Sequence, residues 1–239
     1  LFRSDWILLR LAKIGRTKLH GVDETEQFYN AFFNQNDVQV MSSGGDLRRI
    51  YRGEIMKKVA WACMPAEGAV AVDVGCGTGD NLRYIYRPNS RLFGLEYAEQ
   101  TANIARALLG DKAVVQTATA TAIPLADAYC DLVLCIEVLE HIPDDEKALS
   151  EIARILRPGG SLILSLPYRH WFPSHLKLIG HFRHYTRVDV EQFLSRHGLK
   201  VAEYLPNYPR WSRFANYCYV AARLYVLGLR LFGIKRSPV

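Results

Sequence analysis

Short apolar runs alternate with amphipathic stretches between residues 69 and 205 of this 239-residue chain. The runs lie at residues 70–74, 91–96, 113–117, 131–136 and 161–166. They are nearly continuous rather than alternating, which indicates strands buried on both faces of a parallel sheet. The turn Pro158-Gly159-Gly160 is expected to open the last of them. The pattern therefore predicts a doubly wound, mostly parallel α/β sheet.

Helical stretches lie between and after these runs. In residues 144–156 the apolar positions fall on one stripe, which is typical of a helix packed on a core. A later helix is expected to begin after Thr186, whose side chain would cap it with Asp189 as the capping-box acid. Gly198 is a suitable left-handed terminator for that helix. Leu199 to Leu205 then fits a sixth strand, and we find no convincing seventh.

The two flanks differ from this middle part. Residues 1–68 suggest a helical amino-terminal lid, residues 69–205 a central domain, and residues 206–239 a helical carboxyl-terminal extension. Phe2 to Lys18 and Arg210 to Lys235 are both apolar and basic, which suits either packing on the protein or peripheral membrane contact. Packing is the commoner arrangement, and salt-dependent sedimentation with anionic vesicles distinguishes the two.

Composition narrows the class of protein. A hydrophobic fraction of 49% with 23% charged residues is typical of a soluble globular chain. The net charge of +6 suits an anionic partner or simply a mildly basic surface, and no aromatic pattern indicates nucleic-acid binding. Five cysteines without a C-x-x-C pair argue against a disulfide framework or a zinc knuckle, so we expect a cytoplasmic, reducing location.

The first apolar run ends in the segment Asp73-Val74-Gly75-Cys76-Gly77-Thr78-Gly79. Glycines after a strand let the backbone turn sharply and approach a ligand closely. The start of the following helix offers unpaired N–H groups that can receive a carboxylate. Three alternate glycines exceed what a tight turn requires, so we interpret this loop as a ligand cradle.

The spacing favours a nucleoside-linked amino acid over a dinucleotide. The loop reads G-x-G-x-G instead of G-x-G-x-x-G, and Asp80 would repel a pyrophosphate. Glu96 stands at the end of the second run, seventeen residues after Gly79, where an acid can bind both ribose hydroxyls.

Taken together, VAVDVGCGTG, FGLEYA, IPLADAYCDLVLCIEVLEHIPD and EIARILRPGGSLILSLP resemble the class I S-adenosylmethionine-dependent methyltransferases. The resemblance covers about residues 68–205 and implies a Rossmann-like fold with S-adenosyl-L-methionine as cofactor. It implies that Asp73 and the Gly75–Gly79 loop hold the methionine part, including Cys76, Gly77 and Thr78. Glu96 would hold the ribose and Tyr97 would lie beside the adenine.

Further contacts follow from the same resemblance. The family usually has an acid before the IPLADAYCD segment, but this chain has Thr119 there, which offers the adenine amino group a weaker acceptor. Ala120 and Ile136 would adjoin the cofactor. In the amino-terminal region, Tyr29 would close over it and Arg52 would reach the methionine carboxylate.

Chemistry is expected just after the fourth run, at the carboxyl edge of the sheet. The segment Glu137-Val138-Leu139-Glu140-His141 resembles ubiquinone-pathway O-methyltransferases and small-RNA 3′-end methyltransferases, in which it can ligate a divalent metal. A metal needs further ligands, for which His181 or His184 is available, but the same residues can simply open a helix, and we expect no metal. Glu137, His141 and Tyr185 are the candidate catalytic residues.

The sequence therefore predicts methyl transfer to a small-molecule or a lipid- or glycan-linked acceptor, at a hydroxyl oxygen. Two alternatives stay open, a non-catalytic cofactor-binding module that serves a partner and an N-methyltransferase.

Overall fold

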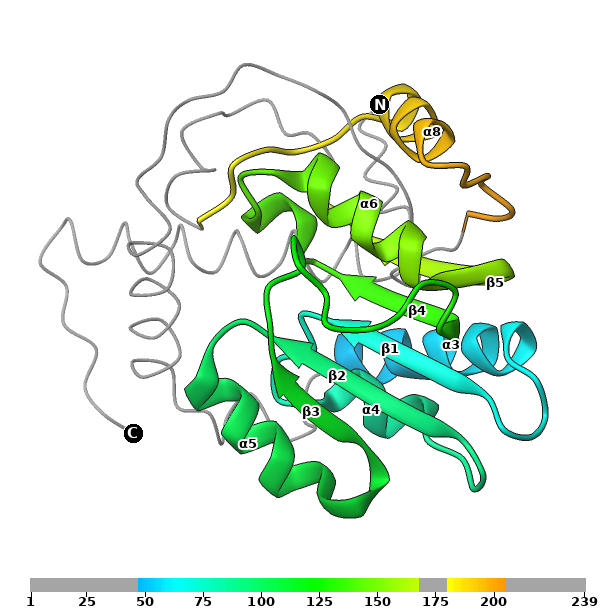
Figure 1. Cartoon of the computed structure of the whole chain (residues 1–239), viewed down its shortest axis with the longest axis vertical. Coiled ribbons are helices and arrows are strands. Elements are labelled where there is room, and N and C mark those ends of the chain that lie inside the picture. Colours follow the sequence, from blue (N-terminus) through cyan, green and yellow to red (C-terminus); the bar gives the residue numbers. More distant parts are fainter. Residues whose placement is uncertain (1–46, 168–179, 205–239) are drawn as a thin grey trace, which may run out of the picture.

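The computed structural model describes residues 47–167 and 180–204, and side chains from residue 53 onward within these ranges (Figure 1). In chain order, the elements up to the third strand are α3 (Leu47–Cys63), β1 (Val70–Val74), α4 (Asp80–Ile85), β2 (Arg91–Glu96), α5 (Glu99–Leu109), η1 (Gly110–Lys112) and β3 (Val114–Thr117). They are followed by β4 (Cys130–Ile136), η2 (Leu139–His141), α6 (Asp145–Ile155), β5 (Leu156–Ser165) and, in the second described range, α8 (Arg187–Arg196).

The five strands form one sheet in the order β3-β2-β1-β4-β5. Every pair in it is parallel, with Val72 opposite Phe93 on one side and Val133 on the other. The strand order reverses between β1 and β4, and ligands of such sheets bind beyond the carboxyl ends of the strands at this reversal. The predicted doubly wound α/β fold is thus confirmed.

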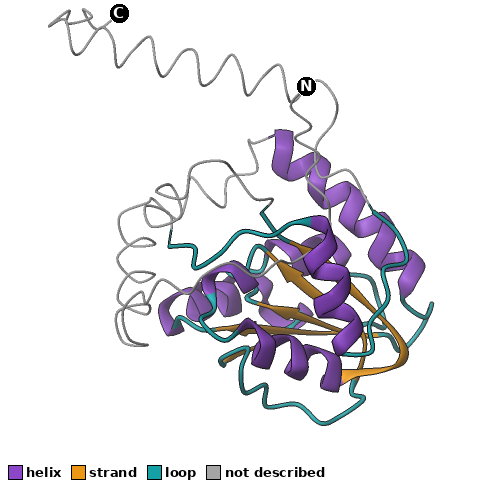
Figure 2. Ribbon diagram, turned by 90° about the horizontal axis from the view of Figure 1, so that it is seen from above, coloured by secondary structure: helices purple, strands orange, loops and turns teal. Residues whose placement is uncertain are grey.

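Helices cover both faces of the sheet (Figure 2). Val72 and Val133 point into a core shared with α6 and α8, whereas Ala71 and Leu132 point into a second core shared with α3, α4 and α5. Because successive strand residues point to opposite faces, a strand buried on both sides must be apolar at every position. This accounts for the nearly continuous apolar runs in the sequence.

Three local predictions need correction. β5 begins at Leu156 and includes the Pro-Gly-Gly turn, which forms an irregularity in the pairing with β4 rather than preceding the strand. Residues 199–204 of the predicted sixth strand form no strand, and Leu199 and Val201 pack against the core that contains α6 and α8, whereas Leu205 lies outside the described residues. The hydroxyl of Thr186 does not cap α8 but donates to the carboxylate of Asp189.

The predicted lid before residue 47, Tyr29 and the extension at 206–239 lie outside the described residues. Arg52 lies in α3, but its side chain is not among those described. Within the described ranges, no helix combines the length and hydrophobicity needed to cross a bilayer.

Candidate active site

The predicted cofactor residues converge because the strands are parallel. The Gly75–Gly79 loop follows β1, Glu96 ends β2, and Thr119 follows β3. Ile136 ends β4 and Glu137 comes directly after it. All of these positions therefore lie at the same carboxyl edge of the sheet.

The three glycines of the loop have different surroundings. All have positive φ, between 54° and 84°, a conformation that side chains disfavour. A Cβ at Gly75 would lie 2.5 Å from Val138 Cγ2, and one at Gly79 would lie 2.6 Å from Leu109 Cδ1. A Cβ at Gly77 would meet nothing within 4 Å. Gly75 and Gly79 are thus required for packing, whereas Gly77 leaves an open space in the cradle.

Asp73 is fully buried beneath this loop, and within residues 47–167 and 180–204 no donor meets either of its carboxylate oxygens with full hydrogen-bond geometry. Burial raises the pKa of Asp73 to about 8, and the nearby Glu96 carboxylate adds to the rise while Asn81 opposes it. A buried carboxylate without partners is costly. A cationic or hydroxyl-bearing ligand at the cradle would satisfy it.

Glu96 joins the loop to the end of β2. Its Oε2 accepts a hydrogen bond from the Gly77 backbone N–H at 2.9 Å, and its Oε1 accepts one from Ala98 N–H at 3.0 Å. Burial raises the pKa of Glu96, although these backbone donors counteract the effect. Each carboxylate oxygen can accept a second bond, so the side chain keeps the capacity to bind ribose hydroxyls.

The other predicted cofactor residues are half-buried around this cradle, except Cys76, whose side chain is buried in the core. Thr119 Oγ1 lies 2.9 Å from Thr121 Oγ1 and accepts from the Thr121 N–H at 3.3 Å. Thr119 therefore stabilises the turn after β3 through these contacts.

The predicted cofactor residues that are half-buried are Thr78, Tyr97, Thr119, Ala120 and Ile136.

Glu137 has a strained backbone at the end of β4, with φ of 56°. Its N–H donates to the Ser165 carbonyl at 3.0 Å, and its carboxylate accepts from the Ser165 hydroxyl. Strained non-glycine residues cost about 1–3 kcal/mol and cluster at functional sites. Both contacts tie Glu137 to the carboxyl end of β5.

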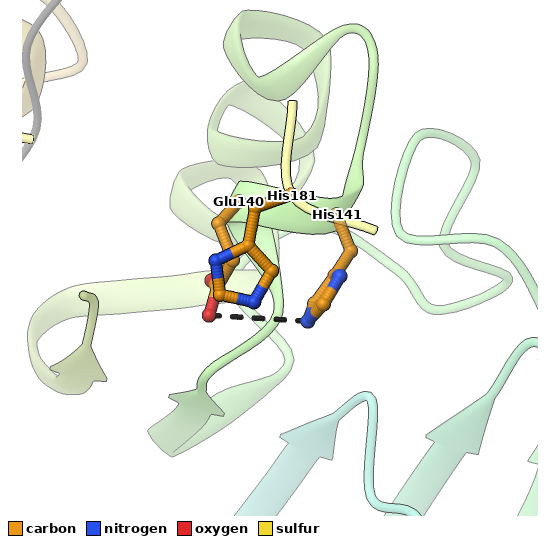
Figure 3. Close-up of side chains that lie close together, drawn as sticks. All are labelled: Glu140, His141 and His181. Carbon is orange, nitrogen blue, oxygen red and sulfur yellow. Dashed lines mark ion pairs between the residues drawn. The ribbon is translucent and has the colours of Figure 1, made fainter. Parts of the chain in front are cut away.

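Glu140, His141 and His181 form a second cluster, shown in Figure 3. One potential ligand atom from each lies within 4.8 Å of the others. Glu140 is 0% exposed, and among the described residues no group donates a hydrogen bond to either of its carboxylate oxygens. Burial raises the pKa of Glu140 well above its usual range, and repulsion by Glu137 adds to this. Burial also lowers the pKa of His141.

The segment at 180–186 is fixed against η2 and the loop that follows it. Phe182 N–H donates to the Glu140 carbonyl at 2.8 Å. The Arg183 guanidinium donates to the carbonyls of Ile142 and Pro143 and pairs with Asp145 at 3.0 Å. These bonds hold His181 beside Glu140 and His141, which precede it by about forty positions in the sequence.

Tyr185 differs from the other two candidate catalytic residues. Its side chain is 1% exposed and belongs to the hydrophobic core between the sheet and the helices α6 and α8. Burial raises the pKa of its hydroxyl well above the usual range. The phenol packs in this core, and a catalytic role for Tyr185 stays a prediction.

Two features of this edge were missed in the sequence. Val138 lies between the two glutamates in the sequence, and its side chain fills the space beside Gly75. Ser165 holds Glu137 from the end of β5, where the strand-end rule could have indicated it. The sequence offered both His181 and His184 as possible neighbours of the Glu140-His141 pair, and the structure places His181 in the cluster with that pair.

Comparisons with known proteins bear on this site. Residues 72–164 match the family model described as "Methyltransferase domain". A probable chloroplastic tocopherol O-methyltransferase of Oryza sativa subsp. japonica is 29% identical over 86% of this chain and 55% of its own length. A ubiquinone biosynthesis O-methyltransferase of Aeromonas salmonicida is 32% identical over 47% of this chain and 49% of its own length. The chain thus spans about half the length of these curated relatives.

One solved structure is matched over a larger share of its own length than these two relatives are. It is a complex between the Haloferax volcanii Trm112 methyltransferase activator and the putative methyltransferase, with 27% identity and a TM-score of 0.58. The match covers 75% of this chain and 78% of that one.

Proposed function

The described core of this chain is a class I S-adenosylmethionine-dependent methyltransferase domain, and on that premise we propose that the protein methylates a hydroxyl oxygen of a small-molecule or a lipid- or glycan-linked acceptor. S-adenosyl-L-methionine is the cofactor of this family. The O-methyltransferases among the relatives support an oxygen acceptor.

One contact carries the proposal. The space left by Gly75 is filled by Val138, the residue between Glu137 and the Leu139–His141 turn. The cofactor cradle and the Glu-His cluster therefore adjoin each other. A methyl donor in the first would face an acceptor bound near the second, and such positioning supplies much of the rate of a direct displacement.

The residues of the cradle fit the cofactor. The buried Asp73 and the open space at Gly77 suit the methionine part, and the Glu96 carboxylate suits the ribose. When bound, the cofactor supplies a methyl group whose bond to sulfur breaks, leaving the electron pair on sulfur, as the bond to the acceptor oxygen forms. The chain must position the acceptor and accept its hydroxyl proton, for which Glu137 and His141 are the groups at this edge.

Transfer of a labelled methyl group tests the proposal. We expect the full chain to move label from S-adenosyl-L-methionine to components of a cell extract, identified by mass spectrometry as hydroxyl compounds that gain a methyl. Loss of a general base costs about 10²–10⁴ in rate. His141→Gln or Glu137→Gln should therefore slow transfer at least about a hundredfold, whereas His197→Gln, away from this edge, should not.

The outcomes separate the alternatives. Partition of the labelled product into organic solvent or water distinguishes a lipid-linked from a soluble acceptor. Label on nitrogen would replace the proposal with N-methylation. Cofactor binding without any transfer would indicate a non-catalytic module that serves a partner.

A further inference from the structure

We propose that a pair of hydroxyl groups, on Thr119 and Thr121, contacts position 6 of the purine of the cofactor and accepts a 6-oxo purine as well as adenine. Thr119 is then a specificity-determining residue with an unusually broad tolerance for the base. The inference rests on the proposed function, because it concerns the base end of the same cofactor site. It can be measured by binding alone, without any methyl transfer.

The turn after β3 adjoins the residue that suits the ribose. The Ala118 N–H donates to the carbonyl of Glu96 at 2.9 Å, one position before Thr119. Because β2 lies between β1 and β3, a ligand with its methionine part after β1 and its ribose at Glu96 extends its base toward β3. Thr119 and Thr121 are half-buried in that turn, which the bond from Ala122 N–H to the Thr119 carbonyl closes at 3.1 Å.

The side chains of this turn offer hydroxyls and no carboxylate, since residues 118–122 are Ala-Thr-Ala-Thr-Ala. A carboxylate only accepts hydrogen bonds, so it would select the 6-amino group of adenine against a carbonyl oxygen. Glu99 at the start of α5 does not supply one, because it pairs with Arg106 at 2.8 Å and accepts from the Thr117 hydroxyl. A hydroxyl both donates and accepts, so it can bond with either kind of base.

The two hydroxyls form a hydrogen bond whose direction can reverse. Thr119 Oγ1 lies 2.9 Å from Thr121 Oγ1, and either atom can be the donor. Thr119 Oγ1 also accepts from the Thr121 N–H at 3.3 Å. Since a hydroxyl has one proton and two lone pairs, these two contacts leave one bonding position of Thr119 for the base.

The direction of the bond determines what Thr119 offers at this position. When Thr119 donates to Thr121, its second lone pair accepts from a 6-amino group. When Thr121 donates to Thr119, both lone pairs of Thr119 are used and its proton is donated to a 6-oxo oxygen. The reversal needs only the rotation of two O–H bonds, so neither purine leaves an unsatisfied polar group at Thr119.

Titration calorimetry of the full chain with S-adenosyl-L-homocysteine and S-inosyl-L-homocysteine tests the inference. We expect the wild type to bind both, with dissociation constants within about tenfold of each other, because Thr119 bonds with either base. Thr119→Asp should raise the preference for the adenosyl compound at least about tenfold above the wild-type ratio, because a carboxylate repels a 6-oxo oxygen. The aspartate can still accept from the Thr121 N–H, which preserves the turn.

Two further variants are the matched controls. Thr119→Ser keeps the hydroxyl and should keep the wild-type ratio of the two dissociation constants. Thr119→Val has the same shape without the hydroxyl and should weaken both compounds by a similar factor. The N1 atom also differs between the two bases, but this difference is common to all the proteins, so a change in the ratio reports on position 6.

Three results would overturn the inference while leaving the cofactor site intact. They are a wild type that already prefers the adenosyl compound as strongly as Thr119→Asp does, an unchanged ratio in folded Thr119→Asp, and loss of only one compound in Thr119→Val. Circular dichroism establishes that each variant is folded. If the folded wild type bound neither compound, the cofactor site would be wrong and the proposed function would fail with it.

Discussion

Gly75 and Gly77 stand two positions apart in the same loop, yet they are needed for different reasons. Both have positive φ, but only Gly75 faces a neighbour, Val138. Gly75→Ala should lower the free energy of unfolding by about 1–3 kcal/mol through overpacking, beyond the backbone cost of about 1 kcal/mol that both substitutions share. Gly77→Ala should show the backbone cost alone.

Urea denaturation of the two variants measures this difference. Equal losses of stability would mean that Val138 moves aside freely and that Gly75 is not a packing residue. Because Gly77 faces the cradle, its alanine variant should lose cofactor affinity even where its stability is nearly preserved.

For single residues, the sequence predicts the position along a strand or loop well and the burial of the side chain poorly. Asp73 lies near the end of β1, Gly77 follows that strand and Glu96 ends β2, so their positions come directly from the strand pattern. Tyr185 was a candidate catalytic residue in the sequence, and its side chain packs in the core. Burial of a single side chain depends on distant neighbours, which local spacing does not report.

Among the elements, α6 is bonded to the segment that precedes β4. Glu151 Oε2 accepts from the Ile123 N–H at 3.0 Å, and Arg154 donates to the Ile123 carbonyl at 2.9 Å while pairing with Glu151. The bonds from Arg154 and from Ile123 lower the pKa of Glu151 to about 2. The pair thereby holds the turn that carries Thr119 and Ala120.

Glu151→Gln should therefore lower the free energy of unfolding by about 2 kcal/mol at neutral pH, since it leaves a charge and a backbone donor poorly satisfied. Because the folded pKa is below the unfolded value near 4.5, the wild-type contribution is present above pH 4.5 and lost as pH falls toward about 2. The variant should show a flatter stability profile across that interval.

Glu146, the exposed partner of Arg196, provides a control substitution for this stability measurement. Glu146→Gln removes the pairs with Arg196 and His197, and because this glutamate is 46% exposed, each pair is worth about 0–1 kcal/mol. If Glu151→Gln cost no more than Glu146→Gln, the connection between α6 and the turn after β3 would be unimportant for stability.

The strands of the sheet were predictable because burial on both faces leaves a continuous apolar run. The sixth strand was not, since Leu199 and Val201 are apolar for another reason, namely contact with the core. Likewise, the Pro-Gly-Gly segment has the composition of a turn, but it lies within β5 as an irregularity that keeps pairing with β4. An apolar or turn-like composition does not specify which backbone partner a segment finds.

For the whole molecule, parallel topology explains why residues from four strands share one edge. That part of the site follows from the predicted fold. The Glu140-His141-His181 cluster does not, because it requires the chain to return over η2 after β5 and to be fixed there by Arg183. The three-dimensional structure brings the side chains of Glu140, His141 and His181 together.

The central claim is that this edge binds S-adenosyl-L-methionine, and titration calorimetry of the full chain tests it most directly. The account predicts binding of S-adenosyl-L-methionine and of its demethylated product, no binding of NAD, and loss of binding in Gly77→Arg, whose side chain would fill the space in the cradle. Absence of binding by the folded wild type, or unchanged binding by Gly77→Arg, would contradict the account.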